Sequence, residues 1–113
     1  MRYPKVDKNQ KQVVKELREL GFSVALTHMV HKGFPDFVVG FHGLNILIEL
    51  KSENGTLTKD ETVFINTHKG KVIVAYSTLD VVDGFLSFVY QLDGLREPSF
   101  LQLELSKILR KLN

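Results

Sequence analysis

The sequence has 113 residues, of which 43% are hydrophobic and 25% are charged, and its formal net charge is +2. This composition is typical of one globular domain and excludes a disordered chain. The absence of cysteine excludes disulfides, thiolate zinc sites and cysteine nucleophiles, and it suits a reducing cytoplasm. No apolar run reaches the ~18 residues of a membrane-spanning helix, and the residues after Met1 do not resemble a secretory signal. We therefore expect a cytoplasmic, non-membrane protein with a single domain over residues 1–113.

Positive charge is concentrated near the start of the chain. Residues 1–32 contain seven lysines and arginines against three acids, whereas residues 33–95 contain four lysines against eight acids. Lys8 and Lys11 are therefore candidate contacts to a phosphate backbone. A solvated helix face has the same composition and is the alternative interpretation.

The hydrophobic spacing predicts an α/β fold. A helix is expected over residues 8–20, because apolar side chains recur there at helical spacing before Gly21. The remaining elements are strands at 22–29, 35–41, 46–52 and 72–76, and helices at 58–69, 79–92 and 99–112. Consecutive strands predict an antiparallel meander, and the helix before the fourth strand permits a parallel crossover. The expected core is a mixed four-stranded sheet in the order αβββαβ over about residues 7–85, flanked by helices.

The segment from His42 to Asn45 has the composition of a tight turn between two of these strands. Pairing through this turn makes residues whose positions sum to about 87 face each other. Asp36 is then expected opposite Lys51, with Glu49 on the diagonal.

Asp36, Glu49 and Lys51 are the candidate catalytic residues. Asp36 begins one strand, whereas Glu49 and Lys51 lie two positions apart at the end of the next and share one face. The two carboxylates and the Leu50 carbonyl provide the oxygen ligands that Mg²⁺ prefers. Lys51 can orient a water molecule or stabilise charge on a phosphodiester under attack. The pattern predicts a Mg²⁺- or Mn²⁺-dependent nuclease, and an ordinary surface ion pair is the alternative.

The first helix carries polar residues on its sheet-facing stripe. Asp7 and Gln10 share a face with Val14 and Leu17, whereas Glu16 is expected on the solvated side. Asp7 is either a third acid at the metal site, with Gln10 beside it, or the N-cap of the helix.

Three motifs together resemble the virus-type replication-repair nuclease domain, a branch of the PD-(D/E)XK superfamily. They are Gly33-x-Pro35-Asp36, Glu49-x-Lys51 and the segment Leu57-Thr58-Lys59-Asp60-Glu61. The resemblance implies a restriction-endonuclease-like core, metal binding by Asp36 and Glu49, and a catalytic Lys51. It also implies supporting roles at the site for Asp7, Gln10 and Glu61. This sequence departs from the family at two of these positions, because the family has Glu near the start of the first helix, where Asp7 stands here, and Gln where Glu61 stands. A capping box formed by Thr58 and Glu61 explains Glu61 equally well.

The resemblance also implies a substrate and an assembly. Small members of the family occur in phages and bacteria, resemble Holliday-junction resolvases in fold, and in some cases act as dimers on branched DNA. The expected protein is therefore a homodimeric endodeoxyribonuclease selective for branched DNA such as Holliday junctions. A restriction- or transposition-type endonuclease on the same fold and a non-catalytic DNA-binding or assembly module are the alternatives.

Other residues are assigned from local context. His28 and His31 lack a third ligand in sequence and make a poor zinc signature. His31, Lys32 and Lys59 are candidate DNA contacts. The C-terminal helical extension, at about residues 97–113, carries a leucine-rich stripe that either covers its own domain or forms a two-fold contact; its members are Leu101, Leu105, Ile108 and Leu112.

Overall fold

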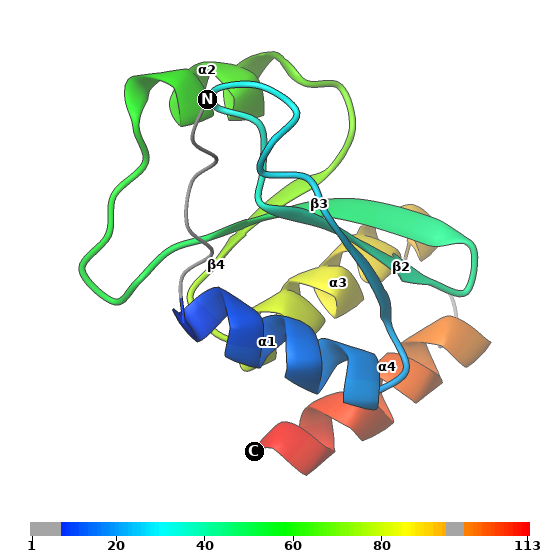
Figure 1. Cartoon of the computed structure of the whole chain (residues 1–113). Helices are drawn as coiled ribbons and strands as arrows, with labels where there is room; N and C mark the ends of the chain where they lie inside the picture. The colour runs from blue at the N-terminus through cyan, green and yellow to red at the C-terminus, as the bar shows by residue number, and fades with distance from the viewer. Residues whose placement is uncertain (1–7, 95–98) are drawn as a thin grey trace.

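The computed structural model describes residues 8–94 and 99–113 and confirms the predicted order of elements. It is an α/β fold in which one helix precedes three consecutive strands, a second helix precedes the fourth strand, and two helices follow the last strand (Figure 1). The largest difference from prediction is at the first strand, which ends three residues early because the chain turns at Thr27, whose carbonyl accepts a hydrogen bond from Val30 N–H. The elements are α1 (Lys8–Glu19), β1 (Ser23–Leu26), β2 (Phe37–Phe41), β3 (Leu44–Leu50), α2 (Lys59–Thr67), β4 (Val72–Ala75), α3 (Thr78–Asp93) and α4 (Phe100–Leu112).

The strands form one mixed sheet in the order β1-β2-β3-β4. Strand β2 is antiparallel to both of its neighbours, β1 and β3, and β4 runs parallel to β3 after the crossover through α2. This topology is the predicted one.

The turn between β2 and β3 is shorter than predicted. It consists of His42 and Gly43, which have φ values of 47° and 86°. Positive φ at both central residues is the geometry of a type I′ turn, whose twist matches that of the paired strands. Leu44 and Asn45 therefore belong to β3, and the ladder starts at the pair Phe41–Leu44.

The shorter turn changes the register at the candidate site. Phe37 pairs with Ile48, so the next position along the ladder brings Asp36 across from Glu49. The prediction that Asp36 faces Lys51 is wrong by two residues, because it assumed a four-residue turn. The observed register places the two carboxyl-bearing residues side by side.

The hydrophobic core covers one face of the sheet. Alternate residues of β2 and β3 are almost fully buried on this face, whereas their neighbours Val38 and Leu47 are only half-buried on the other. Helices α1, α3 and α4 lie on the core side (Figure 1). Helix α3 approaches β4 closely at Gly84, where an added Cβ would lie 2.9 Å from Ile73 Cδ1. The buried strand residues of the core are Phe37, Val39, Ile46, Ile48, Ile73 and Ala75.

The sheet-facing stripe of α1 is confirmed for Gln10, Val14 and Leu17, which are all buried. Glu16 was expected on the solvated side, and this prediction is wrong. Its carboxylate is half-buried and accepts a 2.9 Å hydrogen bond from Thr78 Oγ1, because the start of α3 packs against α1.

Helix α4 packs its leucine-rich stripe on its own domain. Leu105 and Ile108 are buried in the core, and Leu101 and Leu112 pack against it. The first of the two interpretations of this stripe is therefore confirmed, and the homodimer stays a prediction. Within residues 8–94 and 99–113, no helix has the length and hydropathy needed to span a bilayer.

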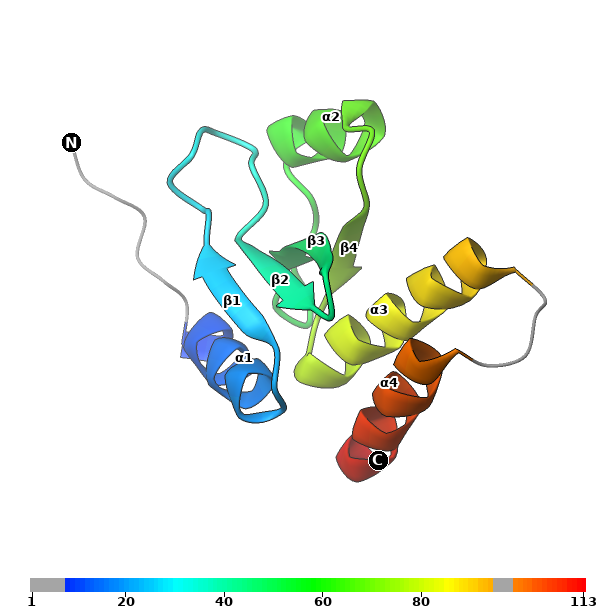
Figure 2. The ribbon, with the colours of Figure 1, turned by 90° about the vertical axis from the view of Figure 1, so that its right-hand side faces the viewer.

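Helix α2 stands apart from the other helices, beside the connection between β1 and β2 (Figure 2). None of its residues is buried. Its contacts to that connection include the Phe34 and Phe64 rings, whose centroids are 5.0 Å apart, and the ion pair of Lys32 with Asp60 at 3.4 Å. Gly33 lies directly against α2, and a Cβ at this glycine would lie 2.7 Å from the Asp60 carbonyl oxygen.

Gly33→Ala is expected to destabilise the fold more than Gly43→Ala. Both glycines have a φ of 86°, so both substitutions strain the backbone alike, but a Cβ at Gly43 meets nothing within 4 Å. The contact with Asp60 should cost about 1–3 kcal/mol in addition. Urea unfolding followed by circular dichroism measures the difference, and equal free energies of unfolding for the two variants would show that α2 does not dock on Gly33.

Candidate functional site

Asp36 is held between two strands by both its backbone and its side chain. Its carbonyl accepts a 2.9 Å hydrogen bond from Thr27 N–H, and its own N–H donates to the Ile48 carbonyl at 2.9 Å. Its carboxylate Oδ2 accepts the Leu50 N–H at 2.8 Å. The preceding Pro35 has no N–H to continue the ladder, so the strand begins after it. The Pro35 carbonyl instead accepts the Thr27 hydroxyl at 2.8 Å. Asp36 is therefore fixed at the end of the sheet.

Glu49 is a buried acid beside Asp36, with a relative exposure of 2%. Burial, then the hydrogen bond to Asp36 and the charges of Asp36 and Glu61, raise the pKa of Glu49 to about 9, and the nearby Lys51 charge only partly opposes this. Glu49 is accordingly protonated at neutral pH and donates to the Asp36 carboxylate. The two carboxyl groups lie side by side at the position predicted for a cation.

Lys51, the first residue after β3, completes the cluster. Its Nζ lies 2.6 Å from Glu61 Oε1 and 4.0 Å from Glu49 Oε2, and its side chain is 15% exposed. Burial acts to lower the pKa of Lys51, but the hydrogen bond with Glu61 and the charges of Glu49, Glu61 and Asp36 raise it above the ordinary value. Lys51 is therefore a fixed ammonium group that contacts two acids.

Glu61 joins the start of α2 to Lys51. Its Oε1 accepts both the Lys51 ammonium and the Thr58 N–H, the latter at 2.8 Å, and the Thr58 hydroxyl accepts the Glu61 N–H in return. The predicted capping box is thus confirmed. Burial acts to raise the pKa of Glu61, but the hydrogen bonds from Lys51 and Thr58 lower it. The sequence did not predict the contact of Glu61 with Lys51. A capping box shows that the Glu61 carboxylate accepts the Thr58 N–H, but it does not show which other side chain donates to the same carboxylate.

The predicted contributions of the first helix are only partly visible. Asp7 lies outside the described residues. Gln10 is 5% exposed, and its Nε2 is buried without a hydrogen-bond partner in the part of the chain that the structure describes. The structure places Gln10 on the predicted stripe but gives it no bond to either carboxylate.

The candidate DNA-binding residues come from the first turn of α1, the connection between β1 and β2, and the start of α2. Lys11 and Lys59 are exposed, and Lys8 begins α1 with a side chain outside the described part. Lys32 is exposed but paired with Asp60. His31 packs against the Phe34 and Phe64 rings at centroid distances of 5.2 and 6.0 Å.

The donor atoms at the site fit a hard divalent cation better than zinc. Within the described ranges 8–94 and 99–113, no group of three or more His, Asp or Glu side chains is arranged to hold a metal ion. The available donors are the Asp36 and Glu49 carboxylates and the Leu50 carbonyl, which points to the same side of β3 as the N–H bound by Asp36. Mg²⁺ typically takes one or two carboxylates and keeps several waters. Two carboxyl groups side by side, with a backbone carbonyl next to them, are a suitable place for such an ion.

Comparison of the sequence with protein-family models gives no match, and comparison with curated proteins gives none either. The resemblance to the replication-repair nuclease domain therefore depends on the motif residues and on their arrangement.

The metal-free protein is expected to lose stability as the pH rises, and Glu49→Gln should remove this loss. Because the pKa of Glu49 is raised from 4.5 to about 9 on folding, its contribution is complete below pH 4.5 and disappears as the pH rises through 9. At pH 8.5 the variant should be more stable by at least about 1 kcal/mol, which corresponds to a melting temperature higher by about 4–8 °C.

Thermal unfolding in chelator at several pH values measures this difference. Glu53→Gln removes an exposed carboxylate and is the matched control. Parallel curves for the wild type and Glu49→Gln would contradict the assignment of the proton to Glu49.

Proposed function

We propose that this protein is a metal-dependent endodeoxyribonuclease that hydrolyses phosphodiester bonds at Asp36, Glu49 and Lys51. The observation that carries the proposal is the convergence of a fixed carboxylate, a second, buried carboxyl group and an ammonium group at one end of the sheet. Burial of Glu49 at 2% exposure makes an ordinary surface ion pair a poor explanation.

Each residue has a distinct part in the proposed reaction. Asp36 and Glu49, with the Leu50 carbonyl, would hold Mg²⁺ or Mn²⁺, which supplies positive charge for phosphate oxygens and lowers the pKa of water. Glu49 must lose its proton to act as a ligand, so metal binding and proton release are coupled. Lys51, oriented by Glu61, stabilises the negative charge that develops on the phosphoryl group.

The proposed fold family is the restriction-endonuclease-like core of the PD-(D/E)XK superfamily. The order αβββαβ, the mixed sheet and the places of the three motifs support it. The corresponding substrate is branched DNA, such as a Holliday junction, in the cytoplasm of a bacterium or of a phage host. A homodimer would present two such sites to the two strands of a symmetric junction.

The wild-type protein is expected to cleave a four-way DNA junction in Mg²⁺ or Mn²⁺ and not in excess chelator. Asp36→Asn, Glu49→Gln and Lys51→Ala should each lower the cleavage rate by about 100-fold or more, because each removes charge or a ligand used in the transition state. Lys107→Ala, which changes an exposed lysine on α4, is the control and should cleave normally.

Denaturing gels with junction, nicked and linear substrates measure these rates, and circular dichroism verifies folding. Sequence-dependent cleavage of linear duplex would favour a restriction-type enzyme. DNA binding without metal-dependent cleavage of any substrate would favour a non-catalytic module. Full activity of Asp36→Asn, or activity in chelator, would refute the assigned site.

A further inference from the structure

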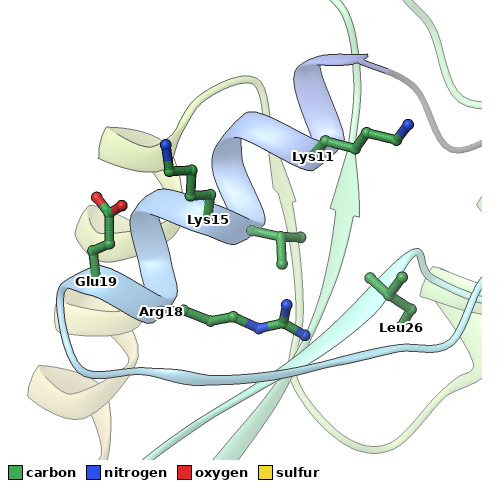
Figure 3. Close-up of a pocket in the computed structure, with 6 residues that line it drawn as sticks. Lys11, Lys15, Arg18, Glu19 and Leu26 are labelled. Atoms are coloured by element: carbon green, nitrogen blue, oxygen red, sulfur yellow. The ribbon is translucent and has the colours of Figure 1, made fainter.

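A groove with a volume of about 360 Å³ lies between α1 and β1 (Figure 3). It is separate from the carboxyl cluster, and among the described side chains that line it three are basic and one is acidic. These described residues are Lys11, Val14, Lys15, Arg18, Glu19 and Leu26.

The groove combines an apolar floor with a basic rim. Val14 is buried at its base, and Leu26 exposes 46% of its surface there, which is a large fraction for leucine in a strand. Lys11 and Lys15 are exposed, and neither forms an ion pair with any residue in the ranges 8–94 and 99–113. Their charges are therefore available to a ligand.

Arg18 closes the edge of the sheet at the same place. In the part of the chain that the structure describes, strand β1 pairs only with β2, and the Arg18 guanidinium donates a 2.9 Å hydrogen bond to the Val24 carbonyl. A guanidinium on this carbonyl opposes the addition of another strand. The groove is therefore poorly suited to an extended peptide that pairs with β1.

The basic side chains form a row along the helix. Lys11, Lys15 and Arg18 are spaced i, i+4 and i+7, so they share one stripe, with steps of about 6 Å and about 4.5 Å along the axis. A row of separate charges suits a ligand with repeating negative charges better than a single anion. Among the described residues that line the groove none is aromatic, so contacts to a nucleic-acid backbone are favoured over stacking on bases.

The groove reaches the end of the sheet that carries the candidate site. Leu26 pairs with Phe37, the first residue of β2, and the next residue, Thr27, donates its N–H to the Asp36 carbonyl. Adjacent strands are about 4.8 Å apart. Leu26 shares the core face of the sheet with Phe37, whereas the two acids lie on the opposite face, so a strand of DNA at the carboxyl cluster passes around the edge strand β1 to meet the groove.

We infer that the groove of Lys11, Lys15 and Arg18 binds the sugar-phosphate backbone of DNA that flanks the scissile phosphate. The inference rests on the proposed function for the identity of the ligand. Contacts of the groove with phosphates would contribute to the affinity for DNA independently of base sequence, and this contribution would weaken as the salt concentration rises.

The test compares DNA binding by two double variants with matched spacing. Lys11→Gln/Lys15→Gln removes two charges from the groove, whereas Lys107→Gln/Lys111→Gln removes two exposed charges at the same i, i+4 spacing on α4. Fluorescence anisotropy of a labelled four-way junction and a labelled duplex is measured in chelator over a range of salt concentrations, so that cleavage does not interfere. Arg18 is left unchanged because it also bonds to β1.

The groove variant should bind about tenfold more weakly than the wild type, and its slope of log K against log salt should be shallower by about 1.8, or about 0.9 for each lost phosphate contact. The α4 variant should bind like the wild type.

Equal affinities for the two variants, or absence of DNA binding by the wild type, would overturn the inference. Groove-dependent binding without cleavage in Mg²⁺ would support the inference and refute the proposed nuclease activity. Normal cleavage together with equal DNA binding by the wild type and the groove variant would refute the inference and support the proposed nuclease activity.

Discussion

The pairing of Asp36 with Glu49 is the constraint on which the rest of the site depends. It follows from a turn of two residues, His42 and Gly43, that sets the register of β2 against β3. Strand alternation then directs both acids away from the core face that buries Phe37 and Ile48. A change of register by one residue would move every side chain of the strand to the opposite face and separate the acids.

The charges at the site are balanced by elements that are distant in sequence. Three carboxyl groups, those of Asp36, Glu49 and Glu61, surround the single ammonium group of Lys51, and the protonation of Glu49 relieves the excess of negative charge. Glu61 reaches this cluster because α2 docks on the connection between β1 and β2. The Glu61 side chain therefore has two roles: it caps the start of α2, and it holds the Lys51 ammonium group in position.

Much of this arrangement could be predicted, because it depends on local patterns. Helical spacing located α1, the capping box located the start of α2, and strand alternation placed Glu49 on the face opposite Ile48. The register could not be predicted, because composition does not show that His42 adopts a positive φ, which is uncommon for residues other than glycine. The contacts of Glu61 with Lys51 and of Glu16 with Thr78 depend on tertiary packing, which no local pattern encodes.

Direct observation of Mn²⁺ binding tests the central claim that Asp36 and Glu49 together hold a divalent cation. Paramagnetic broadening of backbone amide signals should centre on Asp36 and on residues 49–51, and it should disappear in Asp36→Asn. Titration calorimetry of the same samples should show release of the Glu49 proton at neutral pH. Broadening centred elsewhere, or unchanged in Asp36→Asn, would contradict the account.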